Sequence, residues 1–327
     1  MVSDKSPPEG SRSVGGTNST GKRAGRRLQV GVGRAMAHHG ELLQGVFEGH
    51  DGRLHRGLIT LPLAAQQSTV TFWPGENGVI RTRPANRRKA ARAAVLTLEY
   101  LGFPSAGGDL TIESDIPVGH GYGSSTADVI AAIRATAAAA GATLRRSTVC
   151  RLAVAAEGAS DAIAYGDQAV LFAHREGRVI EHFGGEHPPL LVVGFRTGRA
   201  RPIDTLSLPR ARYDGQEIEQ FRVLRGLAYQ AVRQQDPRLI GRVATASARI
   251  SQHHLAKPRF EAVVGLAEAH GACGVQVAHS GTLMGVLFDA DECGVASRAA
   301  ALAGTLGQAR FRGIRTFAVN IDGAFLQ

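Results

Sequence analysis

The stretch that decides the fold is PVGHGYGSSTAD, which occupies residues 117–128. Its three alternating glycines let the backbone adopt positive φ values and come close to a ligand. Ser124 and Ser125 follow at once, and the alanine-rich run that continues to Gly141 predicts a helix beginning here. The start of a helix offers unpaired N–H groups and a partial positive charge, which suit a polyphosphate. The stretch therefore predicts a phosphate-binding loop.

The same residues permit a simpler interpretation, a glycine turn followed by a serine that caps the helix. A P-loop is not predicted, because the GK[ST] ending is missing, and the spacing does not match a dinucleotide-binding fingerprint. A hydroxyl of Ser125 or Thr126 could also bind Mg2+, which prefers hard oxygen ligands.

The segments before the loop predict a tail, several strands and one helix. Residues 1–27 are rich in Ser, Gly, Pro and basic residues and lack apolar periodicity, so we expect them to be disordered. LQVGVGRAMAHHG, from Leu28 to Gly40, predicts a short strand followed by a glycine-bearing turn. Further strands are predicted at 57–62, 68–73 and 109–117, and a helix at 86–101 with Asn86 as its N-cap.

The segments after the loop alternate between helix and strand patterns, which favours an α+β fold. A helix is predicted at 147–159, a hairpin turning at Glu176-Gly177, and a buried strand in PPLLVVGF at 188–195. Three helices, two strands, a helix at 293–306 and a closing strand follow. We therefore predict a tail at 1–27, an N-terminal lobe at 28–187 and a C-terminal lobe at 188–327.

Bulk composition narrows the function classes. Of 327 residues, 43% are hydrophobic and 20% charged, which is typical of a folded globular protein. Neither a membrane-spanning run nor a secretory signal is present, so we expect a cytoplasmic protein without a membrane partner. Three widely spaced cysteines form neither a disulfide framework nor a zinc motif. The net charge of +10 alone suggests nucleic acid, but aromatic residues are only 6% and scattered, so nucleic-acid binding is not expected.

Three segments in order resemble the motifs of the GHMP kinases, the superfamily of galactokinase, homoserine kinase and mevalonate kinase. They are GELLQG at 40–45, the PxxxGxGSS pattern beginning at Pro117, and AHSGT at 278–282. The residues within these three motifs, together with SQHHLAKP at 251–258, are most similar to the branch of L-threonine kinases linked to cobalamin and propanediol metabolism.

This resemblance implies a two-lobed fold, with a ribosomal-S5-like N-terminal lobe and a ferredoxin-like C-terminal lobe. It also implies an ATP- and Mg2+-dependent enzyme that phosphorylates a hydroxyl of an amino acid or amino alcohol, with L-threonine the first expectation. The alternatives are another hydroxylated metabolite of a specialised biosynthesis and a non-catalytic nucleotide-binding regulator. Dimers are common among such relatives, so a homodimer is one expectation.

The resemblance assigns the nucleotide and metal residues. Ser125 would reach the β-phosphate and Mg2+, and Glu157 would complete the metal site. The nucleotide-binding residues would be Pro117, Gly119, His120, Gly121, Tyr122, Gly123, Ser124, Ser125 and Thr126.

Two carboxylates are candidates for the base that accepts the hydroxyl proton. Asp161 lies where the threonine-kinase branch carries an acidic residue, and Asp167 resembles the Asp-Gln pair of galactokinase-like members. Either could instead be a turn or cap residue, and we favour Asp161. Some relatives, such as homoserine kinase, manage without such a base.

The acceptor substrate would face the first and third motifs. Glu41 could pair with a substrate amino group. The full substrate-binding set is Glu41, Gln44, His39, Ser280 and Gly281. Taken alone, His38 and His39 lack ligand partners at metal spacing and are interpreted as exposed turn residues. His253 and His254 could hold a substrate carboxylate together with Lys257.

Overall fold

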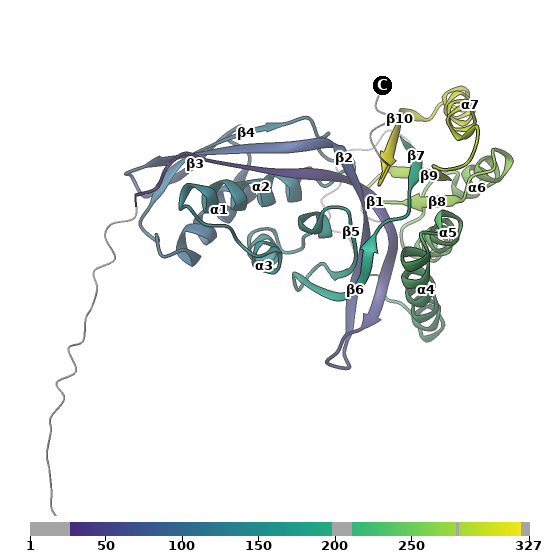
Figure 1. The fold of residues 1–327 in the computed structure, drawn as a ribbon, viewed down its shortest axis with the longest axis horizontal. Coiled ribbons are helices and arrows are strands. Elements are labelled where there is room, and N and C mark those ends of the chain that lie inside the picture. Colours follow the sequence, from purple (N-terminus) through teal and green to yellow (C-terminus); the bar gives the residue numbers. More distant parts are fainter. Residues whose placement is uncertain (1–26, 198–210, 279–280, 322–327) are drawn as a thin grey trace, which may run out of the picture.

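The computed structural model describes residues 27–197, 211–278 and 281–321, which fold into an α+β structure (Figure 1). Within these residues no helix is long and apolar enough to cross a membrane. The strands are β1 (Gly31–Glu48), β2 (Leu54–Gly75), β3 (Ile80–Arg83), β4 (Gly107–Ser114), β5 (Gln168–Ala173), β6 (Arg178–Glu186), β7 (Leu190–Arg196), β8 (Gly274–Val277), β9 (Leu283–Asp289) and β10 (Arg312–Val319). The helices are α1 (Arg88–Tyr100), α2 (Ser124–Ala139), α3 (Arg146–Glu157), the short 3-10 helix η1 (Ala162–Tyr165), α4 (Gly215–Gln234), α5 (Pro237–His254), α6 (Phe260–Ala269) and α7 (Val295–Gln308).

One curled sheet runs through both halves of the chain. Its strand order is β10-β7-β9-β8-β1-β2-β4-β3, and β5 joins it by pairing with β2 and β6. The long antiparallel pair β1–β2 crosses the middle of the molecule, so that it belongs to the sheet on both sides (Figure 1). Helices α1 to α3 lie on one side of the N-terminal strands, and α4 to α7 lie with the C-terminal ones (Figure 1).

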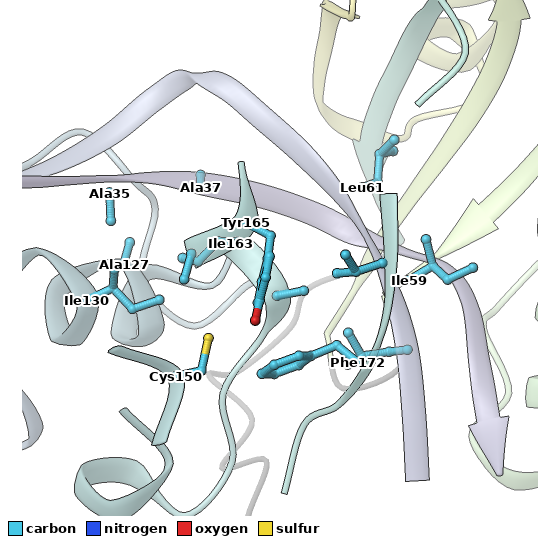
Figure 2. Packing of buried hydrophobic residues seen from close by; sticks show 14 of the residues in the cluster. Ala35, Ala37, Ile59, Leu61, Ala127, Ile130, Cys150, Ile163, Tyr165 and Phe172 are labelled. Atoms are coloured by element: carbon cyan, nitrogen blue, oxygen red, sulfur yellow. The ribbon is translucent and has the colours of Figure 1, made fainter. Parts of the chain in front are cut away.

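Close packing between β1 and α2 fixes the position of the phosphate loop. A Cβ atom at Gly33 would lie 2.2 Å from the carbonyl oxygen of Ala131, so the strand backbone rests directly on the helix. Figure 2 shows Ala35 of β1 above Ala127 and Ile130 of α2. Small side chains on both elements permit this approach, and α2 therefore presents its first turn beside the middle of β1.

Two buried clusters divide the hydrophobic core. The larger one combines the N-terminal strands and helices with parts of α4 and α5, and the smaller one is confined to the C-terminal strands with α5, α6 and α7. The predicted lobe boundary at 187–188 falls in the link between β6 and β7. Because the larger cluster includes side chains from both sides of this link, the two predicted lobes share a core.

Several sequence predictions of element bounds are wrong. The glycine-bearing turn predicted in 28–40 is a bulge inside the single strand β1, where Gly40 has φ of 69° and the register shifts between His38 and Glu41. The strands predicted at 57–62 and 68–73 are one strand, β2, because the residues between them continue the pairing after a register shift. Helix α1 begins after Arg87, not Asn86, and no side chain caps it. The predicted disordered tail lies outside the described residues, apart from Arg27.

Candidate active site

The loop between β4 and α2 has the backbone of an anion-binding site. Gly119, Gly121 and Gly123 have φ values of 81°, 98° and 70°, which favour glycine at each position. Gly123 is the N-cap of α2, and a glycine has no side chain to accept a hydrogen bond from the first N–H groups of that helix. Val118 is exposed and the glycines are half-buried, so the loop lies at the surface. Uncapped N–H groups at an accessible helix start fit phosphate oxygens.

Ser125 and Glu157 meet beside this helix start. The hydroxyl of Ser125 donates to Oε2 of Glu157, the last residue of α3, at 3.2 Å. The other oxygen, Oε1, is buried and has no hydrogen-bond partner among the described residues. Burial, and then the charge of Asp161, raise the pKa of Glu157 to about 7. A buried carboxylate oxygen without a partner, next to a hydroxyl, fits a hard divalent cation.

Asp161 lies one step further from the loop, at the end of the link from α3 to η1. Its Oδ2 accepts a hydrogen bond from Thr126 Oγ1 at 3.4 Å and lies 2.9 Å from His38 Nε2. Burial alone would raise the pKa of Asp161, but the charge and hydrogen bond of His38 outweigh burial and lower it. On the other side of the imidazole, Glu41 Oε1 lies 4.0 Å from His38 Nδ1. One ligand atom each from His38, Glu41 and Asp161 lie within 4.8 Å of one another.

The third motif packs against the phosphate loop. A Cβ atom at Gly281 would lie 2.5 Å from the carbonyl oxygen of His120 and 2.7 Å from Cα of Gly121. The ammonium of Lys257, which is buried, donates to the carbonyl oxygen of Gly281 at 2.6 Å. Burial lowers the pKa of Lys257 to about 8, and the nearby charge of Glu41 opposes this effect. The Lys257 ammonium and the Glu41 carboxylate therefore lie in the same region beside the phosphate loop.

Two other predicted residues, Asp167 and Gln44, are not among those that these contacts join in the described part of the chain. Asp167 is exposed in the turn before β5, and the hydrogen bonds that join Ser125, Glu157, Thr126 and Asp161 in the described part of the chain do not include it. Gln44 lies in β1, where its backbone N–H donates to Ser247 Oγ at 3.1 Å. Ser280 lies outside the described residues.

The interpretation of His38 and His39 as exposed turn residues is wrong, since they are 4% and 1% exposed. His39 points into the core, where Nδ1 lies 2.6 Å from Gln276 Nε2 and the ring contacts Tyr122 edge-on at 5.6 Å between centroids. Burial lowers the pKa of His39 to about 3. Tyr122 is buried as well.

Sequence reasoning missed two residues of the site's geometry. Local sequence spacing indicates no carboxylate partner for His38. Its partner is Asp161, which follows α2 and α3 in the chain. Lys257 was grouped with His253 and His254, but these two histidines lie by Glu217, at 3.2 and 3.0 Å from Oε1. The scarcity of lysine, which occurs at four positions only, is the signal that could have singled out Lys257.

Comparison with known proteins agrees with this geometry. The family model of the GHMP kinase N-terminal domain matches residues 88–174, and that of the GHMP kinase C-terminal domain matches residues 228–302. The chain belongs to the GHMP kinases. It is therefore a phosphotransferase that acts on a hydroxyl group of a small molecule, and ATP is the phosphoryl donor expected of this family.

Two curated relatives are both L-threonine kinases. The protein of Salmonella typhimurium is 31% identical over 80% of this chain and 83% of its own length. That of Citrobacter freundii is 30% identical over 80% of this chain and 87% of its own length. Among solved structures, the homoserine kinase of Cytophaga hutchinsonii superimposes with a TM-score of 0.65 at 14% identity, covering 89% of this chain and 95% of the other. At that identity the superposition supports the fold alone.

Proposed function

We propose that this protein is an ATP- and Mg2+-dependent L-threonine kinase, which forms O-phospho-L-threonine. The observation that carries the proposal is the uncapped glycine-rich start of α2 with the Ser125–Glu157 pair beside it. The similarity to two L-threonine kinases supports the choice of acceptor. Another hydroxylated amino acid remains the alternative acceptor, because a fold does not determine its substrate.

The nucleotide and metal would lie at the start of α2. The backbone N–H groups that follow Gly123 would bind the phosphates, and Ser125 and Glu157 would hold Mg2+. A bound Mg2+ supplies positive charge that neutralises the phosphate oxygens. It would also favour the ionised form of Glu157, whose pKa of about 7 otherwise leaves it partly protonated at neutral pH.

Asp161 would orient the acceptor hydroxyl and take its proton. In the transfer, the acceptor oxygen bonds to the γ-phosphorus while the bond from that phosphorus to the oxygen of ADP breaks. The hydroxyl proton passes to a carboxylate and then to solvent. Asp161 is preferred to Asp167 because it lies against Thr126, in the first turn of α2, while Asp167 is exposed in a turn.

Glu41 and Lys257 are placed to recognise an amino acid. Both are buried, both belong to the region beside the phosphate loop, and the charge of Glu41 raises the pKa of Lys257 against the effect of burial. A substrate ammonium would pair with Glu41, and a substrate carboxylate would accept from the Lys257 ammonium, which has two N–H groups beyond the one that Gly281 accepts. This pairing favours a zwitterion over an amino alcohol.

The test is an ADP-release screen with purified full-length protein, ATP and Mg2+. L-Threonine is compared with an amino alcohol that lacks its carboxylate and a hydroxy acid that lacks its ammonium, and phosphorus NMR identifies the phosphomonoester. We expect turnover with L-threonine and a loss of at least about 100-fold with either analogue. The Lys257→Met variant should lose its preference for L-threonine over the amino alcohol.

Two results would contradict the proposal. Equal turnover of L-threonine and the amino alcohol would refute the role of Lys257 in recognition, and equal turnover of L-threonine and the hydroxy acid would refute that of Glu41. ATP binding without turnover on any hydroxy amino acid, amino alcohol or sugar would refute the enzyme's proposed substrate class and favour the regulator.

A further inference from the structure

A buried histidine joins the phosphate loop to the candidate base. His38 is in the middle of β1, and its Nε2 lies 2.9 Å from Oδ2 of Asp161. Thr126, in the first turn of α2, hydrogen-bonds to the same carboxylate oxygen. Three segments that are distant in the sequence therefore meet at Asp161 Oδ2: the middle of β1, the start of α2 and the link after α3. The start of α2 and the end of α3 also form the proposed nucleotide and metal region.

The position of the His38 ring is fixed by the phosphate loop itself. Its backbone N–H donates to the carbonyl oxygen of Tyr122 at 3.1 Å. A Cβ atom at Gly123 would lie 2.2 Å from Cδ2 of His38, so the ring packs against the bare backbone of the last loop glycine. A movement of the loop would therefore move the imidazole, and with it the carboxylate that the imidazole contacts.

The charged surroundings favour an imidazolium at this position. Burial alone would lower the pKa of His38, but Asp161, through charge and hydrogen bond, and then Glu41 raise it to about 9. A protonated ring donates to Asp161 from Nε2 and leaves Nδ1–H directed towards the side of Glu41. The titratable groups that interact with this pair are His39 and Glu41 of β1, Glu157 of α3 and His174 after β5, and Lys257 after α5 interacts with Glu41.

We propose that His38 is a positioning residue of the kinase, whose imidazolium keeps the Asp161 carboxylate ionised and aimed at the acceptor hydroxyl next to the phosphate loop. This inference rests on the proposed role of Asp161. A divalent cation held by His38, Glu41 and Asp161 is the competing explanation of the same cluster. The hydrogen bond between His38 and Asp161 and the nearby Lys257 ammonium both disfavour it.

The kinetic test compares His38→Gln, which keeps a donor group without the charge, with His187→Gln. His187 is also a buried histidine, but burial is the sole cause of its shifted pKa, and it lies in the link between β6 and β7. We expect His38→Gln to lower kcat by about 100-fold with little change in the KM for ATP, because a misplaced base slows transfer without weakening nucleotide binding. His187→Gln should keep the wild-type kcat.

A double-mutant cycle separates positioning from an independent contribution. The variant His38→Gln/Asp161→Asn should be no slower than Asp161→Asn alone, because His38 acts through Asp161. A wild-type kcat in His38→Gln, or losses that multiply in the double variant, would overturn the proposal.

A second measurement does not depend on the acceptor. In protein labelled in histidine, an NMR pH titration should give His38 a pKa well above the ordinary 6.5, and Asp161→Asn should lower it. This result distinguishes failure of the His38 proposal from failure of the proposed substrate. An unchanged His38 titration in Asp161→Asn would overturn the pairing, as would one zinc ion per chain in the purified protein that His38→Gln removes.

Discussion

The metal role of Glu157 depends on one buried oxygen. Oε2 accepts from Ser125, while Oε1 is buried without a partner among the described residues. An unpaired buried carboxylate oxygen costs folding free energy. Such a cost is typical of sites in which a ligand supplies the missing interaction.

We therefore expect Ser125→Ala and Glu157→Gln to lower kcat by about 100-fold or more while the circular dichroism spectrum stays unchanged. Glu157→Gln should also need more Mg2+ for half of its maximal rate, since an amide oxygen carries no charge. Titrating Mg2+ at saturating ATP measures both effects. The control is Glu99→Gln, which changes an exposed carboxylate of α1. Wild-type rates in both site variants would refute the assignment.

Gly123 combines a backbone and a steric requirement. Its φ of 70° is unfavourable for other residues, and a Cβ there would collide with His38. We expect Gly123→Ala to lower both kcat and the affinity for ATP, because the loop must shift away from His38. Gly102→Ala is the matched control, since Gly102 has φ of 84° and open space around it. If the two variants lose the same stability and have the same rates, the effect of Gly123→Ala comes from backbone strain alone and not from the collision with His38.

At the residue scale, local motifs were predictable and long-range pairs were not. The loop glycines and Ser125 stand next to one another in the chain, so their role follows from sequence order. The contact between His38 and Asp161 depends on tertiary packing. It forms because β1 packs against α2, and α3, which precedes Asp161, packs against α2 as well. No spacing rule connects two residues more than a hundred positions apart.

At the level of elements, the helices were easier to predict than the strands. Helix α4 begins with a capping box formed by Asp214 and Glu217, and α5 has Asp236 as its cap and Pro237 in its first turn. These signals are local. In contrast, β1 and β2 pass through bulges without ending, and Gly40 resembles a turn residue. Whether a glycine ends a strand or bulges within it is decided by the neighbouring strand.

The contact of β1 with α2 is the packing on which the site depends. We expect Gly33→Ala to destabilise the protein by about 2 kcal/mol or more, because the added methyl would meet the Ala131 carbonyl and force the helix away. Gly226→Ala, at an exposed position of α4 with open space, should instead stabilise it by up to about 1 kcal/mol. Urea denaturation measures both. Unchanged stability in Gly33→Ala would contradict the tight packing.

For the whole molecule, basic charge raises the question of a nucleic-acid partner. Residues 1–27 contain six basic residues (Lys5, Arg12, Lys22 and three further arginines) and two acidic ones, so they carry +4 of the net charge of +10. We expect a variant without these residues to lose most of any affinity for DNA and to keep its kinase activity. Salt-dependent binding to duplex DNA measures the first effect and ADP release the second. Undiminished DNA affinity would place the binding surface in the folded part of the chain.

The pH dependence of stability follows from the pair formed by buried His38 and half-buried Asp161. The folded pKa of His38, about 9, exceeds its ordinary value of 6.5, so its contribution is complete below pH 6.5 and is lost as the pH rises through 9. The folded pKa of Asp161 is lowered from 3.8, so its contribution is present above pH 3.8 and is lost when the pH falls through the folded value. The pair therefore stabilises the protein most between these limits.

We expect the difference in Tm between the wild type and His38→Gln to be largest at about pH 6 and to shrink at about pH 9.5, because the wild type has then lost the His38 charge. The control, His187→Gln, removes a histidine whose pKa is lowered to about 4 by burial, so the wild type should lose stability relative to this variant as the pH falls through 6.5, which is opposite in direction to the His38 effect. Thermal unfolding at the two pH values gives both differences. If the His38→Gln difference does not shrink towards pH 9.5, the pKa of His38 is not raised in the folded protein, and the ion pair cannot be what holds Asp161 against the phosphate loop.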